Sequence, residues 1–145
     1  MTNAGAVELA RTCNVVVACG ADDAACAMLN TACVAARTPL VWGDAHGALG
    51  CVTVLAGEDA NTPCYTCLRT HQLQQLFNGE PRAVLAEATA AFIGTMQVTE
   101  TIKLLVGMRG TPAGRLLMYD TLAATVTERR LAKDTGCVTC SGARA

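Results

Sequence analysis

Aromatic and charged residues are both scarce in this 145-residue chain. Phe, Trp and Tyr make up 3% of it, and Asp, Glu, Lys and Arg together make up 16%. The net charge is −1 and the densest basic stretch is Arg129-Arg130, directly after Glu128. We therefore expect no partner that is a nucleic acid and no binding to an anionic membrane.

Long apolar runs are missing as well. No stretch approaches the ~18 apolar residues that a membrane-spanning helix needs. The first residues also lack the basic start and the apolar core of a secretory signal. Both absences favour a cytoplasmic protein.

Aliphatic residues and cysteine are abundant instead. Hydrophobic residues make up 52% of the chain, and there are nine cysteines. A chain of this length buries roughly 68–70% of its unfolded surface. We predict one domain over residues 1–145, with a core of Val, Leu, Ile, Ala and Met.

The first part of the chain alternates strand and helix patterns. Residues 14–19 form a short apolar run that is typical of a strand buried on both faces. Asp22 and Asp23 are placed to cap a helix over 24–37, and residues 40–42 read as the next, parallel strand. This order predicts an α/β fold.

The second part of the chain predicts a glycine-rich turn over 43–50 and another strand over 51–55. A long helix follows over 83–106, and two strands follow over 115–119 and 124–131, the second alternating in polarity.

The long helix is expected to be largely buried, because apolar residues occur on several of its faces. Gly94 would let a neighbouring element approach closely, and Gly107 would end the helix. The main apolar stripe is predicted to be Leu85, Ala88, Phe92, Met96 and Thr99.

Five cysteines lie in or beside apolar segments, where a free thiol behaves as a small hydrophobe. We interpret them as core residues, because disulfides are rare in a reducing cytosol. Trp42, the only tryptophan, is expected in the core or at an interface, with a ligand-stacking role as the alternative. The five cysteines are Cys13, Cys19, Cys26, Cys33 and Cys51.

The other four cysteines form two Cys-x-x-Cys pairs, Cys64 with Cys67 and Cys137 with Cys140, separated by 69 residues. Two such pairs supply the four thiolates that a structural zinc ion prefers. A redox role is the alternative, but a redox pair normally opens a helix after a strand, whereas Pro63 and Gly136 precede these pairs. We predict a structural zinc site that ties the middle of the chain to its end.

An acid–base cluster is a weaker alternative site. Asp44 and His46 would share one face of an extended segment. Glu58, Asp59 and His71 are the other titratable residues near them in the sequence. Solvated polar groups are the simpler interpretation of all five.

In their order along the chain, several stretches resemble the ThiF/MoeB/HesA family, relatives of ubiquitin-activating enzymes. The resemblance covers residues 14 to 141. The stretches are 14–22, 29–33, 38–41, Pro63-Cys-Tyr-Thr-Cys-Leu68, 94–97, 100–105, 114–120 and Gly136-Cys-Val-Thr-Cys140.

The resemblance implies an incomplete Rossmann-like sheet, with parallel strands followed by C-terminal antiparallel strands, helices and a four-cysteine zinc site. It also implies that only the C-terminal half of the family's domain is present. Family members use ATP and magnesium to adenylate the C-terminal glycine of a ubiquitin-like or sulfur-carrier protein.

Several of the family's working residues have no match. The sequence holds no Gly-x-Gly-x-x-Gly turn. The family's metal-linked aspartate aligns with Ala21, one position before Asp22, and its nearby arginine aligns with Cys26. Residues 68–84 contain no cysteine that could accept an acyl group or sulfur. We therefore assign no catalytic residue, and ATP with magnesium is not expected as a cofactor of this chain alone.

Three functional hypotheses remain: a split subunit that binds a ubiquitin-like protein or a full-length relative, a non-catalytic platform for oligomerisation, and an adenylating subunit completed by a second chain. A parallel sheet without its first strands exposes an open edge and apolar helix faces. We expect a homodimer or a hetero-complex.

Overall fold

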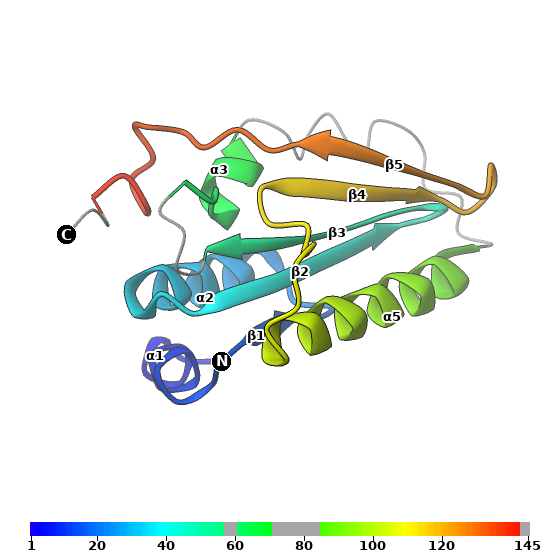
Figure 1. Ribbon diagram of the computed structural model, residues 1–145. Helices are drawn as coiled ribbons and strands as arrows, with labels where there is room; N and C mark the ends of the chain where they lie inside the picture. Colours follow the sequence, from blue (N-terminus) through cyan, green and yellow to red (C-terminus); the bar gives the residue numbers. More distant parts are fainter. Residues whose placement is uncertain (57–60, 71–84, 143–145) are drawn as a thin grey trace.

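Five strands form one mixed sheet in the computed structural model, which describes residues 1–56, 61–70 and 85–142 (Figure 1). The strand order across the sheet is the same as the order along the chain, β1-β2-β3-β4-β5. The strands are β1 (Val16–Ala18), β2 (Pro39–His46), β3 (Leu49–Ala56), β4 (Arg115–Asp120) and β5 (Thr125–Arg130). The helices are α1 (Asn3–Thr12), α2 (Asp23–Ala36), α3 (Tyr65–Leu68) and α5 (Ala86–Leu105).

The β1–α2–β2 unit confirms the strand–helix–strand pattern predicted from the sequence. β1 and β2 are parallel, with Val17 opposite Val41. The carboxylate of Asp22 caps α2, because its Oδ1 accepts a hydrogen bond from the backbone N–H of Ala25 at 2.7 Å. Arg37 ends the helix with a positive φ of 58°.

The predicted turn over 43–50 is wrong. β2 continues to His46 and β3 already starts at Leu49, so the two strands form a long antiparallel hairpin. Gly47 begins the two-residue turn with a positive φ of 60°, the conformation that such tight hairpin turns require and that glycine adopts without strain. The glycines at 43 and 50 lie inside strands, and their role is to admit α5.

α5 packs against the backbone of β2 and β3. A Cβ atom added to Gly43 would lie 2.8 Å from Ile93 Cγ2 and 2.9 Å from Gln97 Cδ, and one added to Gly50 would overlap the Ile93 side chain. Gln97 also donates a hydrogen bond from Nε2 to the carbonyl of Ala18 at 2.8 Å, which ties the end of β1 to this helix. The close approach predicted at Gly94 is wrong, since nothing lies within 4 Å of a Cβ there.

Two predictions for α5 are also wrong. The helix is not largely buried, and the face that meets the sheet differs from the predicted stripe. Its buried residues are Thr89, Ile93, Gln97 and Glu100, whereas Phe92, Val98 and Ile102 are exposed. Polar side chains reach the buried face because they are paired: Thr89 with Thr121 at 2.7 Å, and Glu100 with Lys103 at 2.6 Å. The predicted end of the helix is confirmed, as Gly107 follows it with a φ of 66°.

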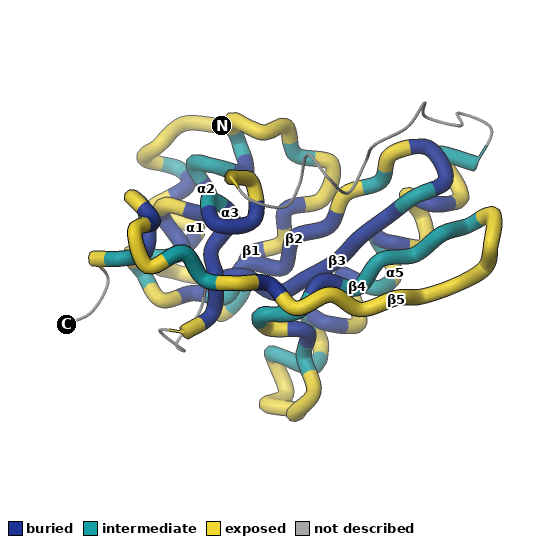
Figure 2. Tube along the Cα trace, turned by 90° about the horizontal axis from the view of Figure 1, so that it is seen from above, coloured by how far each residue is buried: buried dark blue, intermediate teal, exposed yellow. Residues whose placement is uncertain are grey.

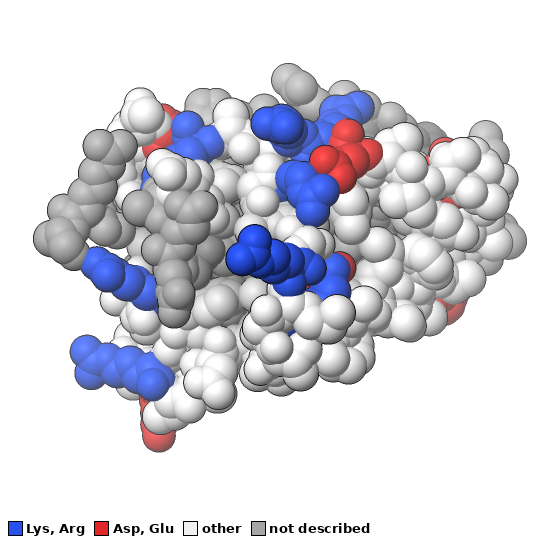
Figure 3. All heavy atoms as spheres, in the orientation of Figure 1, with Lys and Arg blue, Asp and Glu red and all other residues white. Residues whose placement is uncertain are grey.

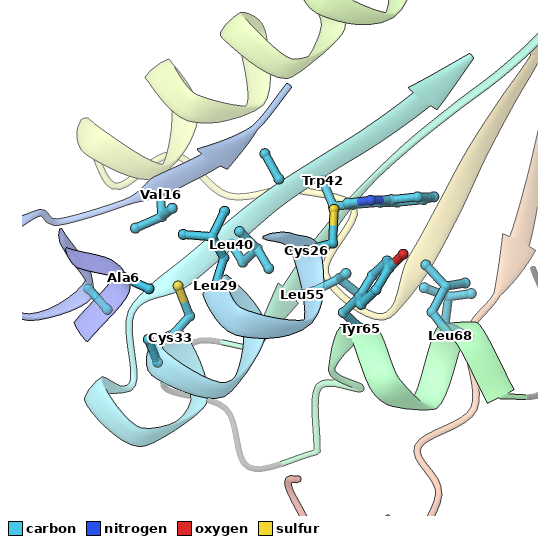
Figure 4. Packing of buried hydrophobic residues seen from close by; sticks show 14 of the residues in the cluster. Ala6, Val16, Cys26, Leu29, Cys33, Leu40, Trp42, Leu55, Tyr65 and Leu68 are labelled. Carbon is cyan, nitrogen blue, oxygen red and sulfur yellow. The ribbon is translucent and has the colours of Figure 1, made fainter. Parts of the chain in front are cut away.

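The two faces of the sheet carry different cores. Helices α1, α2 and α3 cover one face, where the main cluster includes Leu40, Trp42 and Leu55 (Figure 4). α5 covers the other, where a smaller cluster holds Val41, Val52 and Val54. The prediction of a core or interface position for Trp42 is confirmed, since it is 2% exposed.

β4 and β5 form a hairpin at the far edge of the sheet. All six residues of β5 are exposed, as the yellow strand in Figure 2 shows. On the face seen in Figure 3, basic side chains are spread out, with broad uncharged areas between them. Ion pairs join Arg115 to Glu128 at 2.9 Å, Lys103 to Glu100 at 2.6 Å and Arg69 to Asp23 at 2.6 Å. Within the described part of the chain, no helix has the length and apolar character to cross a membrane.

Candidate metal centre

All four cysteines of the two Cys-x-x-Cys pairs converge in one buried cluster. Their sulfur atoms lie within 4.8 Å of one another. The separations are 3.9 Å for Cys64–Cys67, 3.7 Å for Cys64–Cys137 and 3.6 Å for Cys67–Cys140. Sulfurs bound tetrahedrally to zinc at about 2.3 Å stand about 3.8 Å apart, so the spacing fits a four-thiolate metal site. All of these thiols are free, not joined in disulfides.

Each pair lies on a tight backbone turn. Cys64 is the N-cap residue directly before the short helix α3, and the N–H of Leu68 bonds to its carbonyl at 3.2 Å. In the second pair the N–H of Ser141 bonds to the carbonyl of Cys137 at 3.0 Å. Cys64 therefore does open a helix, as a redox cysteine would, although no strand precedes it directly. The convergence of two pairs is what favours a metal site.

The thiols of this cluster differ in acidity. Burial alone raises the pKa of the Cys137 thiol, but hydrogen bonds from the backbone of Cys140 and Thr139 and from neighbouring thiols outweigh it and lower the pKa to about 7. Burial raises the pKa of Cys67, and burial together with hydrogen bonding to Cys67 raises the pKa of Cys140. Cys137 is thus the first of these three thiols to become the thiolate that binds a metal.

A polar network that the sequence analysis missed surrounds the cluster. The side chain of Asn30 on α2 accepts a hydrogen bond from the backbone N–H of Tyr65 at 2.7 Å and donates one to Thr66 Oγ1 at 3.2 Å. Thr66 Oγ1 in turn lies 2.9 Å from Thr139 Oγ1. One sequence signal could have revealed this network: threonine is the third residue of both cysteine pairs, Cys-Tyr-Thr-Cys and Cys-Val-Thr-Cys.

α3 also contacts the start of α2. Tyr65 donates its hydroxyl hydrogen bond to Asp23 Oδ1 at 2.9 Å, and Arg69 forms an ion pair with Asp23 Oδ2 at 2.6 Å. Burial, followed by the hydrogen bond to Asp23, raises the pKa of Tyr65. The Tyr65 ring lies beside Trp42, with ring centres 5.7 Å apart (Figure 4). The carboxylate of Asp23 is therefore already engaged by two partners.

The remaining five cysteines divide into two groups. Cys26, Cys33 and Cys51 are buried, which confirms their predicted place in the core. Cys13 and Cys19 are exposed, so the same prediction is wrong for them. Both lie just outside regular elements, after α1 and after β1, where the apolar neighbours in the sequence do not enclose them.

The alternative acid–base site gains no support. Asp44 and His46 do share a face of β2, as expected from their spacing, but both are exposed to solvent. Asp44 Oδ1 accepts a hydrogen bond from the backbone of Ala45 at 2.8 Å. Glu58, Asp59 and His71 lie outside the described residues.

Comparison with known families fits this architecture. A sequence model described as the ThiF family matches residues 1–139. The chain belongs to the ThiF family. The resemblance noted from the sequence is thereby confirmed, and the paired cysteines fall within, or one residue beyond, the matched region.

Curated ThiF-family relatives are adenylyltransferases. The chain is 36% identical to the molybdopterin-synthase adenylyltransferase of Escherichia coli (strain K12), over 77% of this chain and 44% of that protein. It is 33% identical to the sulfur carrier protein ThiS adenylyltransferase of the same organism, over 91% of this chain and 51% of that protein. It is 35% identical to the adenylyltransferase and sulfurtransferase MOCS3 of Drosophila ananassae, over 97% of this chain and 31% of that protein. The chain thus spans about half, or less, of the length of these relatives.

Solved structures support the ThiF-like fold at much lower sequence identity. The crystal structure of E. coli MccB with ATP has a TM-score of 0.64 at 13% identity and covers 94% of this chain and 43% of its own. A heterocyclase in complex with substrate and cofactor has a TM-score of 0.67 at 16% identity, and the match covers 95% of this chain and 23% of the heterocyclase chain. These similarities establish an α/β fold shared with ThiF-like proteins.

Proposed function

We propose that this chain is the metal-pinned, partner-binding part of a ThiF-type adenylating system, and that it does not catalyse adenylation alone. Residues 1–145 would act as one unit in the cytoplasm, equivalent to the C-terminal half of the family's domain. Its partner would be a sulfur-carrier or ubiquitin-like protein, a relative that supplies the nucleotide site, or a second copy of the chain. Relatives named for ThiS and for molybdopterin synthase support the carrier class.

We also propose that the ion held by Cys64, Cys67, Cys137 and Cys140 is zinc in a structural role. Four buried thiolates leave no open position for a substrate, which is the donor set of structural zinc sites. The ion would join α3 to the segment after β5 and would take no part in bond making. Its contribution would be to the free energy of folding.

The residues that follow β1 support the non-catalytic proposal most directly. Ala21 stands where the family resemblance implies a metal-linked aspartate. Asp22, one position later, uses its carboxylate to cap α2, and Asp23 is paired with Tyr65 and Arg69. Cys26 replaces the family's arginine and is buried. A magnesium ion would therefore have to compete with the helix cap at Asp22 and with Tyr65 and Arg69 at Asp23.

Calorimetry and mass spectrometry test this proposal together. The purified chain is mixed with Mg-ATP and with a ThiS-type carrier that ends in Gly-Gly. We expect no adenylated carrier and no tight nucleotide binding, but measurable carrier binding. Formation of the carrier adenylate by the chain alone would contradict the proposal, and the variant Ala21→Asp would then show whether the side chain at that position limits the rate.

An apolar surface beside β1 favours the second candidate, an adenylating subunit completed by another chain. Val17 on β1 is 41% exposed, and Val98 and Ile102 on α5 are 58% and 53% exposed. They line one surface hollow of about 200 Å³. Within the described sheet, β1 has β2 as its only neighbour, so its outer edge is open to a further strand. An exposed apolar face next to an open parallel edge is suited to receive a strand and a helix from another polypeptide.

Sedimentation tests this surface. We expect the chain at micromolar concentration to form dimers, or to form a stable complex when a ThiF-type relative is added. Val98→Asp should shift the chain to a monomer, while Val126→Asp, at the similarly exposed Val126 of β5, should leave association unchanged. A wild-type chain that stays monomeric, both alone and with the ThiF-type relative, would contradict a role for this surface.

A further inference from the structure

Asn30 performs a task at the first cysteine pair that the cysteine cannot perform itself. α3 begins at Tyr65, whose backbone N–H has no partner within such a short helix. Its capping residue, Cys64, makes no side-chain hydrogen bond to the helix. The side-chain oxygen of Asn30 accepts this N–H at 2.7 Å instead. A residue of another helix thus caps α3, and the Cys64 sulfur stays available for the metal.

The other end of the Asn30 amide extends the contact to the second cysteine pair. Asn30 is fully buried, where an unpartnered amide would be costly. Its Nδ2 donates to Thr66 Oγ1 at 3.2 Å. Because Thr66 accepts this bond, its own hydroxyl hydrogen is free to be donated to Thr139 Oγ1, 2.9 Å away. The chain of bonds therefore runs from α2 through α3 to the C-terminal pair.

We propose that Asn30, Thr66 and Thr139 form a latch that positions the two cysteine pairs for the metal. The inference rests on the metal site proposed above and adds residues that do not bind the ion. The side chains touch each other and the backbone beside the sulfurs, so they are positioning residues. Polar groups that orient metal ligands from behind typically change metal affinity by about 10–100-fold when they are removed.

The separation of the pairs in the sequence explains why a latch is useful. Thr66 and Thr139 lie 73 positions apart. Bringing such distant segments together costs conformational entropy, and the latch would help the ion and the rest of the fold to offset that cost. With the latch closed, three pairs of these sulfurs already stand 3.6 to 3.9 Å apart, and all four lie within 4.8 Å of one another. The ion then meets an assembled site.

Thr66→Val and Thr66→Ser form the decisive matched pair, because valine keeps the shape without the hydroxyl and serine keeps the hydroxyl. Zinc affinity is measured in the full chain by competition with a chromogenic chelator. We expect Thr66→Val and Thr139→Val each to weaken zinc binding about 10-fold, and Thr66→Ser to keep the wild-type affinity. In the double variant the two losses should not multiply, because both changes break the same bond.

A cobalt spectrum separates positioning from a general loss of stability. Replacing zinc by Co²⁺ reports the geometry of the thiolates, and we expect the visible bands of Thr66→Val to shift while those of Thr66→Ser match the wild type. Thr31→Val is the control on α2, since the Thr31 hydroxyl donates to the carbonyl of Ala27 in its own helix at 3.0 Å and takes no part in the latch. Asn30→Ala should weaken binding at least as much as Thr66→Val, because it breaks the bond to Thr66 and also leaves the backbone N–H of Tyr65 without its acceptor.

The outcomes distinguish the two levels of the proposal. If the wild-type chain binds neither zinc nor cobalt, the metal site itself is wrong and the latch with it. If the wild type binds both ions and Thr66→Val binds them within about 2-fold with an unchanged spectrum, the metal site stands and the latch is overturned.

Discussion

The two faces of the sheet are held together by different means. On the α2 and α3 face, the core contains the thiols of Cys26, Cys33 and Cys51, and the metal-site cysteines lie at its border. On the α5 face, the cluster around Val41, Val52 and Val54 contains no thiol. Hydrogen bonds occur on both faces, but one face also contains the buried thiols and borders the cysteine cluster, whereas the other depends on close contact between a helix and glycine backbone. The first should respond to metal and pH, and the second to side-chain volume.

Loss of one metal ligand should have the largest effect. Cys137→Ser should reduce metal stoichiometry and lower the free energy of unfolding by at least about 3 kcal/mol, since structural zinc contributes roughly 10–16 kcal/mol of apparent binding energy in small domains. Elemental analysis and urea unfolding measure both quantities. Cys13→Ser, at an exposed cysteine, is the control and should change neither. A normal metal content in Cys137→Ser would contradict metal binding by this cysteine, and metal could then not distinguish the two faces of the sheet.

Volume on the α5 face should have the next largest effect. A Cβ at position 50 would lie 2.7 Å from Ile93 Cδ1, so Gly50→Ala should destabilise the chain by about 1–3 kcal/mol. Gly94→Ala is the matched control, since its Cβ meets nothing within 4 Å and alanine favours the helix by about 0.5–1 kcal/mol. Thermal unfolding gives both values.

Ile93→Ala sharpens this test, because it removes both the Cγ1 and the Cδ1 atoms that the new methyl group would meet. The double variant Gly50→Ala with Ile93→Ala should lose less stability than the sum of the losses in the two single variants. Equal melting temperatures for Gly50→Ala and Gly94→Ala would show that α5 does not rest on the strands as closely as the structure places it.

Alkaline pH should act on the thiol-containing face alone. Burial raises the pKa of Cys33 from 9.0 to about 11 and that of Cys51 to about 12. These thiols stabilise the fold fully below pH 9. As the pH rises from 9 toward 11 the unfolded chain releases protons that the folded chain keeps, so stability falls by up to about 1.4 kcal/mol per pH unit for each thiol.

The variant Cys33→Ala isolates this contribution. The stability difference between pH 8 and pH 10, measured by urea unfolding, should be smaller than in the wild type, whereas Cys13→Ala should keep the wild-type difference. An identical loss in all three proteins would assign the alkaline sensitivity to other groups.

Elements with local signals were predictable from the sequence. The capping carboxylate of Asp22, the apolar run that contains β1 and the glycine after α5 all act within a few residues, and each was predicted. The cysteine cluster was also predictable, because two Cys-x-x-Cys pairs in one chain indicate four thiols that bind the same metal ion. The structure places their sulfurs together, as that spacing required.

Features that depend on distant packing were not predictable. In the sequence, Gly43 and Gly50 indicate a turn. In the structure they lie inside β2 and β3, because α5 packs directly against their backbone. The buried stripe of α5 was misjudged because Gln97 and Glu100, which are polar, are buried with partners, while Phe92 stacks on Tyr119 at the surface with ring centres 4.0 Å apart. Asn30 gave no local signal, because its partners lie 35 and 36 residues away.

The missing side chains at Gly43 and Gly50 also affect how the molecule can change over evolution. Any larger residue at either position forces α5 outward, so an accepted substitution there needs a smaller residue on the helix in the same lineage. Positions 43 and 50 should therefore vary together with positions 93 and 97, and this covariation would be visible in the sequences of relatives without any measurement on the protein.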